Sequence, residues 1–190
     1  FSVNPSNPII NQQYIFVDSK LNIKWKNVFN SENKPIIAIN WQGNPDMEKE
    51  EYNGRSIPLE FFEPLFDLDK FTIISLQKGY GSEQIKRFSK KNKFSRCQKY
   101  IDDVYDFTEM AAIINNCDLI ISSDTSIAHL AGALGKQIWL LLNKSPYWTW
   151  GDKGNVSFWY ESMRIFRQRH SNNWDEVIHN VCEELMGIKN

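Results

Sequence analysis

The residues with the clearest chemical potential lie between Ser122 and Ser126, where hydroxyl side chains surround the carboxylate of Asp124. The apolar run before them, Leu119 to Ser122, predicts a buried strand, and the small and apolar residues from Thr125 to Leu134 have helical spacing. The first amides of such a helix have no partner inside it and carry a partial positive charge. Phosphate groups bind readily at such a position. The junction therefore predicts the phosphate or diphosphate end of a nucleotide-type site.

Other polar and aromatic residues follow the predicted strands of the chain. Ligands of parallel α/β sheets bind at the carboxyl ends of the strands, so these residues are expected to meet at one crevice. The planar guanidinium of Arg55 can bind two phosphate oxygens at once. His129 lies one turn inside the predicted helix, and we take it and Arg55 as candidate catalytic residues. The candidate substrate-binding residues are Trp41, Gly43, Arg55, Gln77, Lys78, Asp124, Thr125, Ser126 and His129.

Each of these residues also has a purely structural interpretation. Asp124 is a common type of helix N-cap, and His129 is compatible with a satisfied core histidine. Arg55 is compatible with a surface ion pair. Trp41 is compatible with core packing, or with stacking on a base or a sugar. The remaining polar residues are compatible with strand ends, loop surface or first-turn positions: Gln77, Lys78, Thr125 and Ser126.

The elements that must position these residues alternate between strand and helix. The predicted strands are Ile36–Asn40, Phe71–Leu76, Lys99–Asp102, Leu119–Ser122, Gln137–Leu142 and Met163–Phe166. The predicted helices are Leu21–Phe29, Leu59–Phe66, Ser82–Lys91, Asp106–Asn116, Thr125–Leu134 and Trp174–Met186. This order predicts an α/β fold, a Rossmann-like parallel sheet flanked by helices on both faces. Residues 1–33 are expected to be a lead-in or linker segment, and residues 34–190 a Rossmann-like domain that binds a nucleotide-type ligand.

Three local signals refine the helices. Asp106, with Glu109 three residues later, has the arrangement of a capping box. Pro64 must lie early in its helix or cause a kink. Gly135 is expected to close the helix before it as a C′ residue.

Composition excludes several classes of protein. The 190 residues carry a net charge of −1, which gives no reason to expect a nucleic-acid partner. No run approaches the roughly 20 apolar residues of a membrane span. The three widely spaced cysteines, Cys97, Cys117 and Cys182, favour neither a disulfide framework nor a metal site and suit a reducing cytosol, so a cytoplasmic protein without a metal is expected.

Two segments have open interpretations. The basic run from Lys86 to Arg96 is typical of a solvated helix face, with a surface for an acidic lipid or an anionic acceptor as the alternative. The Trp-rich run from Trp148 to Trp159 is compatible with a rigid aromatic loop packed on the sheet edge, or with a platform for a sugar or an acceptor.

The run Ser123 to Gly135 resembles the D-T-x-x-x-H-L-A-x-A-L-G motif of the heptosyltransferase-like glycosyltransferases of family 9. The run resembles even more closely the relatives of these enzymes that are fused to tetratricopeptide repeats in many bacterial proteins. The resemblance extends in order from about Lys34 to the C-terminus. Other matching stretches include Ile39–Pro45, Arg55–Leu59, Ser75–Gly79, Asp106–Glu109, Trp148–Trp150, Trp159–Arg164 and Phe166–Gln168.

The resemblance implies the C-terminal, donor-binding half of a GT-B glycosyltransferase. In that fold the active site lies between two Rossmann-like domains, and the N-terminal domain holds the acceptor and usually supplies the base. The implied partners are a nucleotide-diphosphate sugar and either that N-terminal domain or tetratricopeptide repeats in a longer chain. No metal and no other cofactor are implied. The 190 residues alone are expected to be inactive.

The resemblance also assigns roles to residues. Asp124, Thr125, Ser126 and His129 would lie at the donor diphosphate and sugar, Arg55 near the phosphates, and Gln77 against the nucleotide. Ser126 stands where many heptosyltransferases have glycine, which argues against an ADP-heptose donor. The alternatives to a glycosyltransferase donor domain are a non-catalytic nucleotide- or protein-binding module of the same fold and a GT-B-type sugar-nucleotide epimerase.

Overall fold

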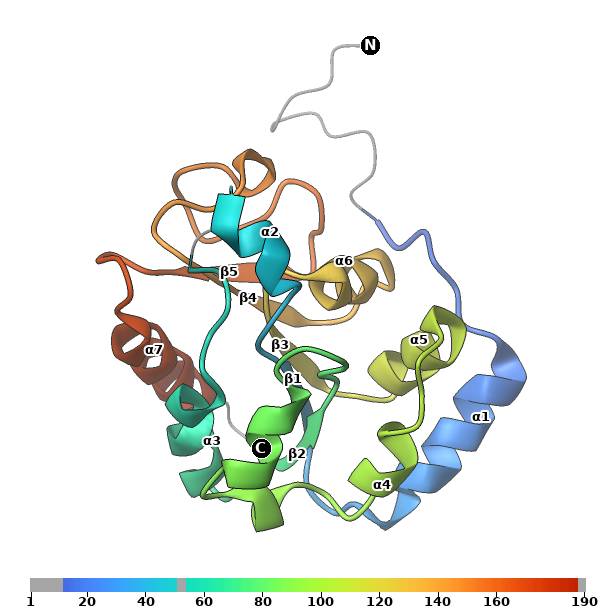
Figure 1. The fold of residues 1–190 in the computed structure, drawn as a ribbon. Helices are drawn as coiled ribbons and strands as arrows, with labels where there is room; N and C mark the ends of the chain where they lie inside the picture. Colours follow the sequence, from blue (N-terminus) through green and yellow to red (C-terminus); the bar gives the residue numbers. More distant parts are fainter. Residues whose placement is uncertain (1–11, 51–53, 188–190) are drawn as a thin grey trace.

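The computed structural model describes residues 12–50 and 54–187, and these residues form one five-stranded parallel sheet (Figure 1). The strand order is β2-β1-β3-β4-β5, and every pair of neighbours runs parallel. The strands are β1 Ile36–Asn40, β2 Thr72–Ser75, β3 Leu119–Ser123, β4 Ile138–Leu142 and β5 Met163–Arg167. The predicted Rossmann-like α/β fold is confirmed.

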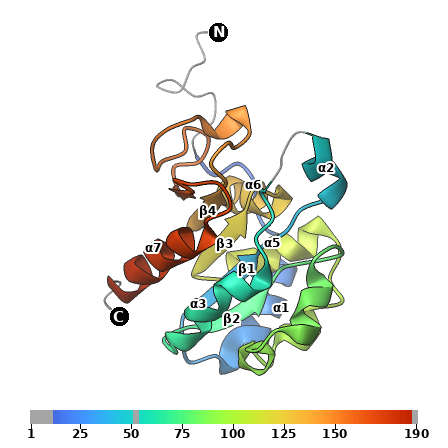
Figure 2. The same cartoon turned by 60° about the vertical axis from the view of Figure 1, so that its left-hand side comes forward.

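Helices cover both faces of the sheet, as the fully buried strands β1, β3 and β4 require. Figure 1 shows α1, α4, α5 and α6 on one face and α3 and α7 on the other, and Figure 2 shows the same two layers from a second direction. The α-helices are α1 Ser19–Val28, α2 Pro45–Glu50, α3 Glu63–Asp67, α4 Gln98–Ile101, α5 Phe107–Asn115, α6 Ser126–Ala133 and α7 Trp174–Gly187. The 3-10 helices are Phe29–Ser31, Leu59–Phe62, Ser82–Arg87, Lys91–Lys93 and Trp148–Trp150.

The helix predicted before the sheet forms as α1 and packs on α5. Trp25 of α1 is buried in the core on this face of the sheet. Its indole Nε1 donates a hydrogen bond to Glu109 Oε1 at 3.0 Å. Residues 1–11 of the expected lead-in lie outside the described residues, and the boundary at residues 33 and 34 stays a prediction.

The capping signals are confirmed in part. The Asp106 side chain accepts a hydrogen bond from Glu109 N at 2.8 Å, as the N-cap of α5. The Glu109 carboxylate does not complete the expected capping box, because it binds Lys24 and Trp25 of α1 instead. Pro64 lies in the first turn of α3, and Gly135 follows α6 with a φ of 68°.

Two predicted elements are wrong. Residues 99–102 form no strand, because the chain there belongs to the short helix α4. The side-chain amide of Gln98 takes the place of a strand beside β2, accepting from Ser75 N at 2.7 Å and donating to Ser75 O at 3.1 Å. The predicted helix 82–91 is a 3-10 helix that ends at Arg87, followed by a second over Lys91–Lys93.

On each outer strand of the sheet, a backbone group forms a hydrogen bond with a neighbouring segment of the chain. Ser95 N donates to Ile73 O beside β2 at 2.9 Å, and Ile165 N of β5 donates to Asn155 O at 2.8 Å. Within the described part of the chain, none of the helices is long and apolar enough to cross a bilayer.

Candidate functional site

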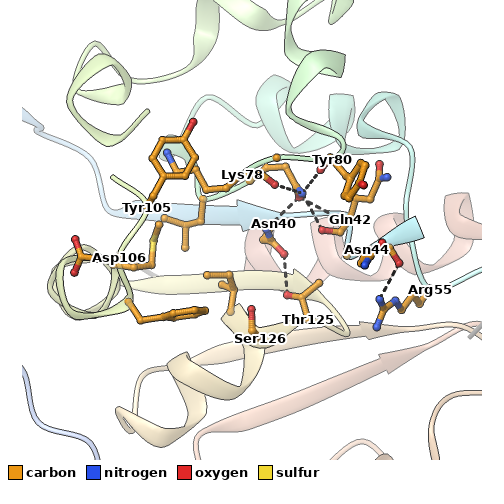
Figure 3. A pocket seen from close by; sticks show the side chains of 17 residues that line it. Asn40, Gln42, Asn44, Arg55, Lys78, Tyr80, Tyr105, Asp106, Thr125 and Ser126 are labelled. Atoms are coloured by element: carbon orange, nitrogen blue, oxygen red, sulfur yellow. Dashed lines mark hydrogen bonds between the residues drawn. The ribbon is translucent and has the colours of Figure 1, made fainter. Parts of the chain in front are cut away.

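A cavity of about 360 Å³ lies at the carboxyl ends of β1 and β2 and at the N-terminus of α6 (Figure 3). Figure 3 shows Tyr105 and Asp106 at one side of it and Asn44 and Arg55 at the other, with Thr125 and Ser126 between them. Parallel strands present their ligand sites at this edge. The lining residues are Asn40, Gln42, Gly43, Asn44, Arg55, Leu76, Gln77, Lys78, Gly79, Tyr80, Tyr105, Asp106, Phe107, Met110, Thr125, Ser126 and Ile127.

The N-terminus of α6 opens on this cavity. Its N-cap is Thr125, in an extended conformation, and no side chain caps the helix. The Thr125 hydroxyl donates instead to Asn40 Oδ1 at 2.8 Å, which ties the N-cap to the end of β1. Because both Ser126 and Ile127 line the cavity, the first turn of the helix borders a space that an anion can enter.

Gln77 lines the cavity, and its amide group joins the loops after β1 and β2. Its Oε1 accepts from Asn40 Nδ2, Trp41 N and Gln42 N at 2.9 to 3.0 Å. Its Nε2 donates to Gln42 O at 2.8 Å and Tyr80 O at 2.6 Å. The side chain therefore shapes the cavity wall.

Lys78 also lines the cavity, but its ammonium group points toward α4. Nζ donates to Ile101 O at 2.5 Å and lies 5.4 Å from the ring centre of Tyr105. Burial lowers the pKa of Lys78, and the nearby carboxylates Asp102 and Asp103 oppose that shift.

Arg55 crosses from the loop after β1 to the start of α6. Its Nη2 donates to Asn44 O at 3.2 Å, its Nη1 approaches Asp124 O at 3.5 Å, and its Nε lies 3.7 Å from Glu48 Oε1. Gly43 makes this course possible, because a Cβ there would lie 2.7 Å from Nη2. Gly43 thus has a steric reason to be glycine.

Asp124 and His129 lie next to the cavity without lining it. Burial raises the pKa of the Asp124 carboxyl, while a hydrogen bond from the Trp150 side chain and the charges of His129 and Arg55 oppose the shift. Burial lowers the pKa of His129, and Asp124 opposes that shift. These two groups form one electrostatic pair at the start of α6.

Aromatic side chains hold the His129 imidazole in place. Its Nδ1 lies 3.0 Å from the Tyr160 hydroxyl, and its ring stacks on Trp150 with centroids 4.9 Å apart. The Tyr160 ring packs over Gly132, where a Cβ would lie 2.4 Å from ring atom Cγ. The loop before β5 is therefore fitted closely to α6.

The side chain of Trp41 is fully buried, with 0% of its surface exposed, in the core formed with α3 and α7. Its Nε1 donates to Gly81 O at 3.2 Å. Trp41 therefore packs in the core and cannot stack on a ligand in this conformation.

The wall of the cavity at the start of α5 was not among the predicted site residues. Tyr105, Asp106 and Phe107 line the cavity there, and Tyr80 lines it after β2. The incorrect strand at residues 99–102 concealed this wall, because it put an additional strand between β2 and α5. The capping signal at Asp106 was the available clue, since it fixes where α5 begins.

No group of three or more His, Cys, Asp or Glu side chains that could hold a metal ion occurs in residues 12–50 and 54–187. The three cysteines are all buried.

The chain is similar in sequence or fold to several known proteins. Residues 104–146 match the model of glycosyltransferase family 9 (heptosyltransferase). The fold matches the E. coli ADP-heptose lipopolysaccharide heptosyltransferase II with a TM-score of 0.66 and 16% identity, over 95% of this chain and 54% of that one. It matches E. coli heptosyltransferase WaaC with ADP-2-deoxy-2-fluoro heptose with a TM-score of 0.56 and 12% identity, over 95% of this chain and 50% of that one.

A curated relative is the protein FlbA of Caulobacter vibrioides, which is 28% identical over 131 residues, 67% of this chain and 21% of that protein. The chain spans about half the length of the solved structures and about a fifth of FlbA. The Rossmann-like sheet of this chain has the same fold as the matching part of these solved heptosyltransferases. The family match covers residues 104–146, and the likeness to the two heptosyltransferases is a likeness of fold.

Proposed function

We propose that this chain is the donor-binding domain of a glycosyltransferase, and that the cavity holds a nucleoside-diphosphate sugar. The observation that carries the proposal is the N-terminus of α6, which no side chain caps and whose first residues line the cavity. The amides of Ser126 and Ile127 offer the diphosphate both hydrogen bonds and the positive end of the helix dipole.

The same arrangement suits the chemistry of glycosyl transfer. As the bond from the sugar carbon to the diphosphate oxygen breaks, the leaving nucleoside diphosphate gathers negative charge. Fixed donors at that position stabilise the transition state more than the ground state. Arg55, held by Asn44 O beside the helix start, supplies a cationic donor at the same edge.

We further propose that binding needs no metal ion, because the helix N-terminus and Arg55 take the charge of the diphosphate. Transfer itself requires the remainder of a two-domain enzyme, since the chain spans about half of the solved heptosyltransferases. In this assignment the base that activates the acceptor belongs to the other half.

Calorimetric titration of the chain with UDP, ADP, GDP and their sugars tests the proposal. We expect saturable binding of at least one diphosphate, with equal affinity in EDTA and in Mg²⁺. Absence of binding to all of these nucleotides would contradict the proposal, and binding only in Mg²⁺ would contradict metal independence.

The matched variants are Ser126→Asp and Ser126→Asn. Ser126 is exposed, so both side chains fit, and Asp in a first turn favours the helix. The carboxylate repels an incoming diphosphate, whereas the amide of the same size does not. We expect Ser126→Asp to weaken binding at least tenfold with the fold intact, and Ser126→Asn to stay within about threefold of the wild type.

A further inference from the structure

The loop between β4 and β5 presents an aromatic pair to the solvent. Trp148 is 69% exposed and Tyr147 39% exposed, and their ring centroids lie 5.5 Å apart. All seven tryptophans of the chain are in the described residues, and five of them are buried: Trp25, Trp41, Trp139, Trp150 and Trp174. The exposure of the Trp148 indole is therefore unusual among the tryptophans of this chain.

The loop that carries the pair is held rigidly by Arg167 of β5. The guanidinium donates to Trp150 O at 2.6 Å, Gly151 O at 3.0 Å and Gly154 O at 2.8 Å. The indole of Trp159 also donates to Thr149 O at 2.9 Å. A surface whose backbone is fixed before binding loses less entropy when a ligand arrives.

The loop contacts residues at the start of α6, beside the candidate site. Trp150, two residues after Trp148, stacks on His129, and its side chain hydrogen-bonds to Asp124 at the start of α6. Figures 1 and 2 both show the orange loop and α2 at the same end of the sheet. The aromatic pair therefore belongs to the edge of the molecule at which the cavity opens.

An exposed aromatic face beside polar side chains can bind a single sugar ring. A pyranose has a face of C–H groups, which packs on an indole, and a rim of hydroxyls that need hydrogen-bond partners. The same loop also carries the exposed polar side chains Lys144, Asp152 and Lys153.

We propose that the Trp148 indole, with the Tyr147 ring inclined to it by 55°, forms a platform that binds a hexopyranose ring. The proposal rests on the function proposed above, because that function brings a donor sugar to this edge, where an acceptor that carries a sugar ring would also meet it. Either source supplies the same ring chemistry, and the experiment separates them.

The experiment follows tryptophan indole and backbone amide signals of the ¹⁵N-labelled chain by NMR, with Trp148 assigned from Trp148→Phe. The probes are methyl glycosides of glucose, galactose, mannose and N-acetylglucosamine, and UDP, ADP and GDP with their sugars. A saturable shift of the Trp148 signal with free glycosides supports the platform and an acceptor source. A shift with nucleotide sugars, but not with the bare nucleotides, supports the platform and a donor source.

Variants sharpen the result. We expect Trp148→Ala to weaken sugar binding at least tenfold and Trp148→Phe by no more than about threefold. Arg167→Lys should weaken binding about tenfold, because lysine cannot hold three carbonyl groups. The control is Tyr100→Ala, which removes another exposed aromatic ring on α4 and should leave binding unchanged.

A Trp148 signal that none of the glycosides or nucleotide sugars moves would overturn the platform. If bare diphosphates still shift the Ser126 amide in that case, the proposed function stands without the platform. If glycosides move Trp148 while the diphosphates bind nowhere, the platform stands and the proposed function fails. Equal losses in Trp148→Ala and Tyr100→Ala would also overturn the platform.

Discussion

The Oδ1 of Asn40, the last residue of β1, accepts a hydrogen bond from the Thr125 hydroxyl, the N-cap of α6, at 2.8 Å. Asn40 is buried, and its Nδ2 donates to Gln77 Oε1 at 3.0 Å. One side chain therefore connects the N-terminus of α6 to both loops of the cavity.

Replacing Asn40 by Ala should remove that connection. We expect a loss of about 2 kcal/mol in the free energy of unfolding, because a buried hydrogen-bonded group is deleted and its partners lose their bonds. Urea unfolding followed by circular dichroism measures the change, and the exposed Asn92→Ala serves as the control. A loss no greater than that of Asn92→Ala would contradict the central position of Asn40.

A substitution of Gln77 tests the role of a single hydrogen-bond donor group. Gln77→Glu keeps the size of the side chain but cannot donate to Gln42 O and Tyr80 O, which the wild-type Nε2 does. We expect a loss of about 3 kcal/mol at neutral pH, since two donor bonds are replaced by repulsive oxygen contacts. The midpoint of urea unfolding should fall with an unchanged m-value. A midpoint equal to that of the wild type would show that the amide donor is not needed.

The contact between Gly132 and Tyr160 predicts overpacking in Gly132→Ala. The new Cβ would lie 2.4 Å from the tyrosine ring, which must move, at a cost of about 1–3 kcal/mol in the free energy of unfolding. In a Tyr160→Ala background the same substitution should cost much less. The double-mutant cycle measures this coupling, and equal costs in both backgrounds would argue against the steric explanation.

The pair of Asp124 and His129 predicts a pH effect. Burial lowers the pKa of His129 below its ordinary value of 6.5, and the charge of Asp124 opposes part of this decrease. Asp124→Asn should therefore lower the pKa of His129 further. NMR titration of the imidazole protons measures it, with the signals of His170 and His179 as internal references. A rise in the pKa would contradict the pairing.

The same shift links stability to pH. A histidine whose pKa is depressed by folding is held neutral in the native state, while the unfolded chain takes up a proton at about pH 6.5. The stability from this group is complete above that pH and is lost as the pH falls below it. Wild type should therefore lose more stability than His129→Gln between pH 7 and pH 5.

The sequence predicted the sheet well, because β1, β3 and β4 are short, almost continuous apolar runs. Such runs are compatible with few structures other than a buried strand. The prediction failed at residues 99–102, where the apolar Tyr100 and Ile101 allowed a strand, and the deciding contact was the amide of Gln98 against Ser75. Such a contact joins residues far apart in the chain, so no local pattern encodes it.

The site was predictable in its position more than in its details. The motif from Ser123 to Gly135 placed the N-terminus of α6 at the sheet edge. The roles of single residues depended on distant partners: Gln77 is engaged by backbone groups, Lys78 turns toward Ile101, and Trp41 is buried. Residue type and spacing do not specify those partners.

The cover over β2 and β5 has a consequence for any longer protein that contains this domain. Unprotected strand margins invite pairing with other chains, which leads to aggregation or to exchange of segments between copies. Here Ser95 shields one margin and Asn155 the other. These contacts occupy a backbone group on each outer strand, which lowers the tendency of two copies to pair through their sheets.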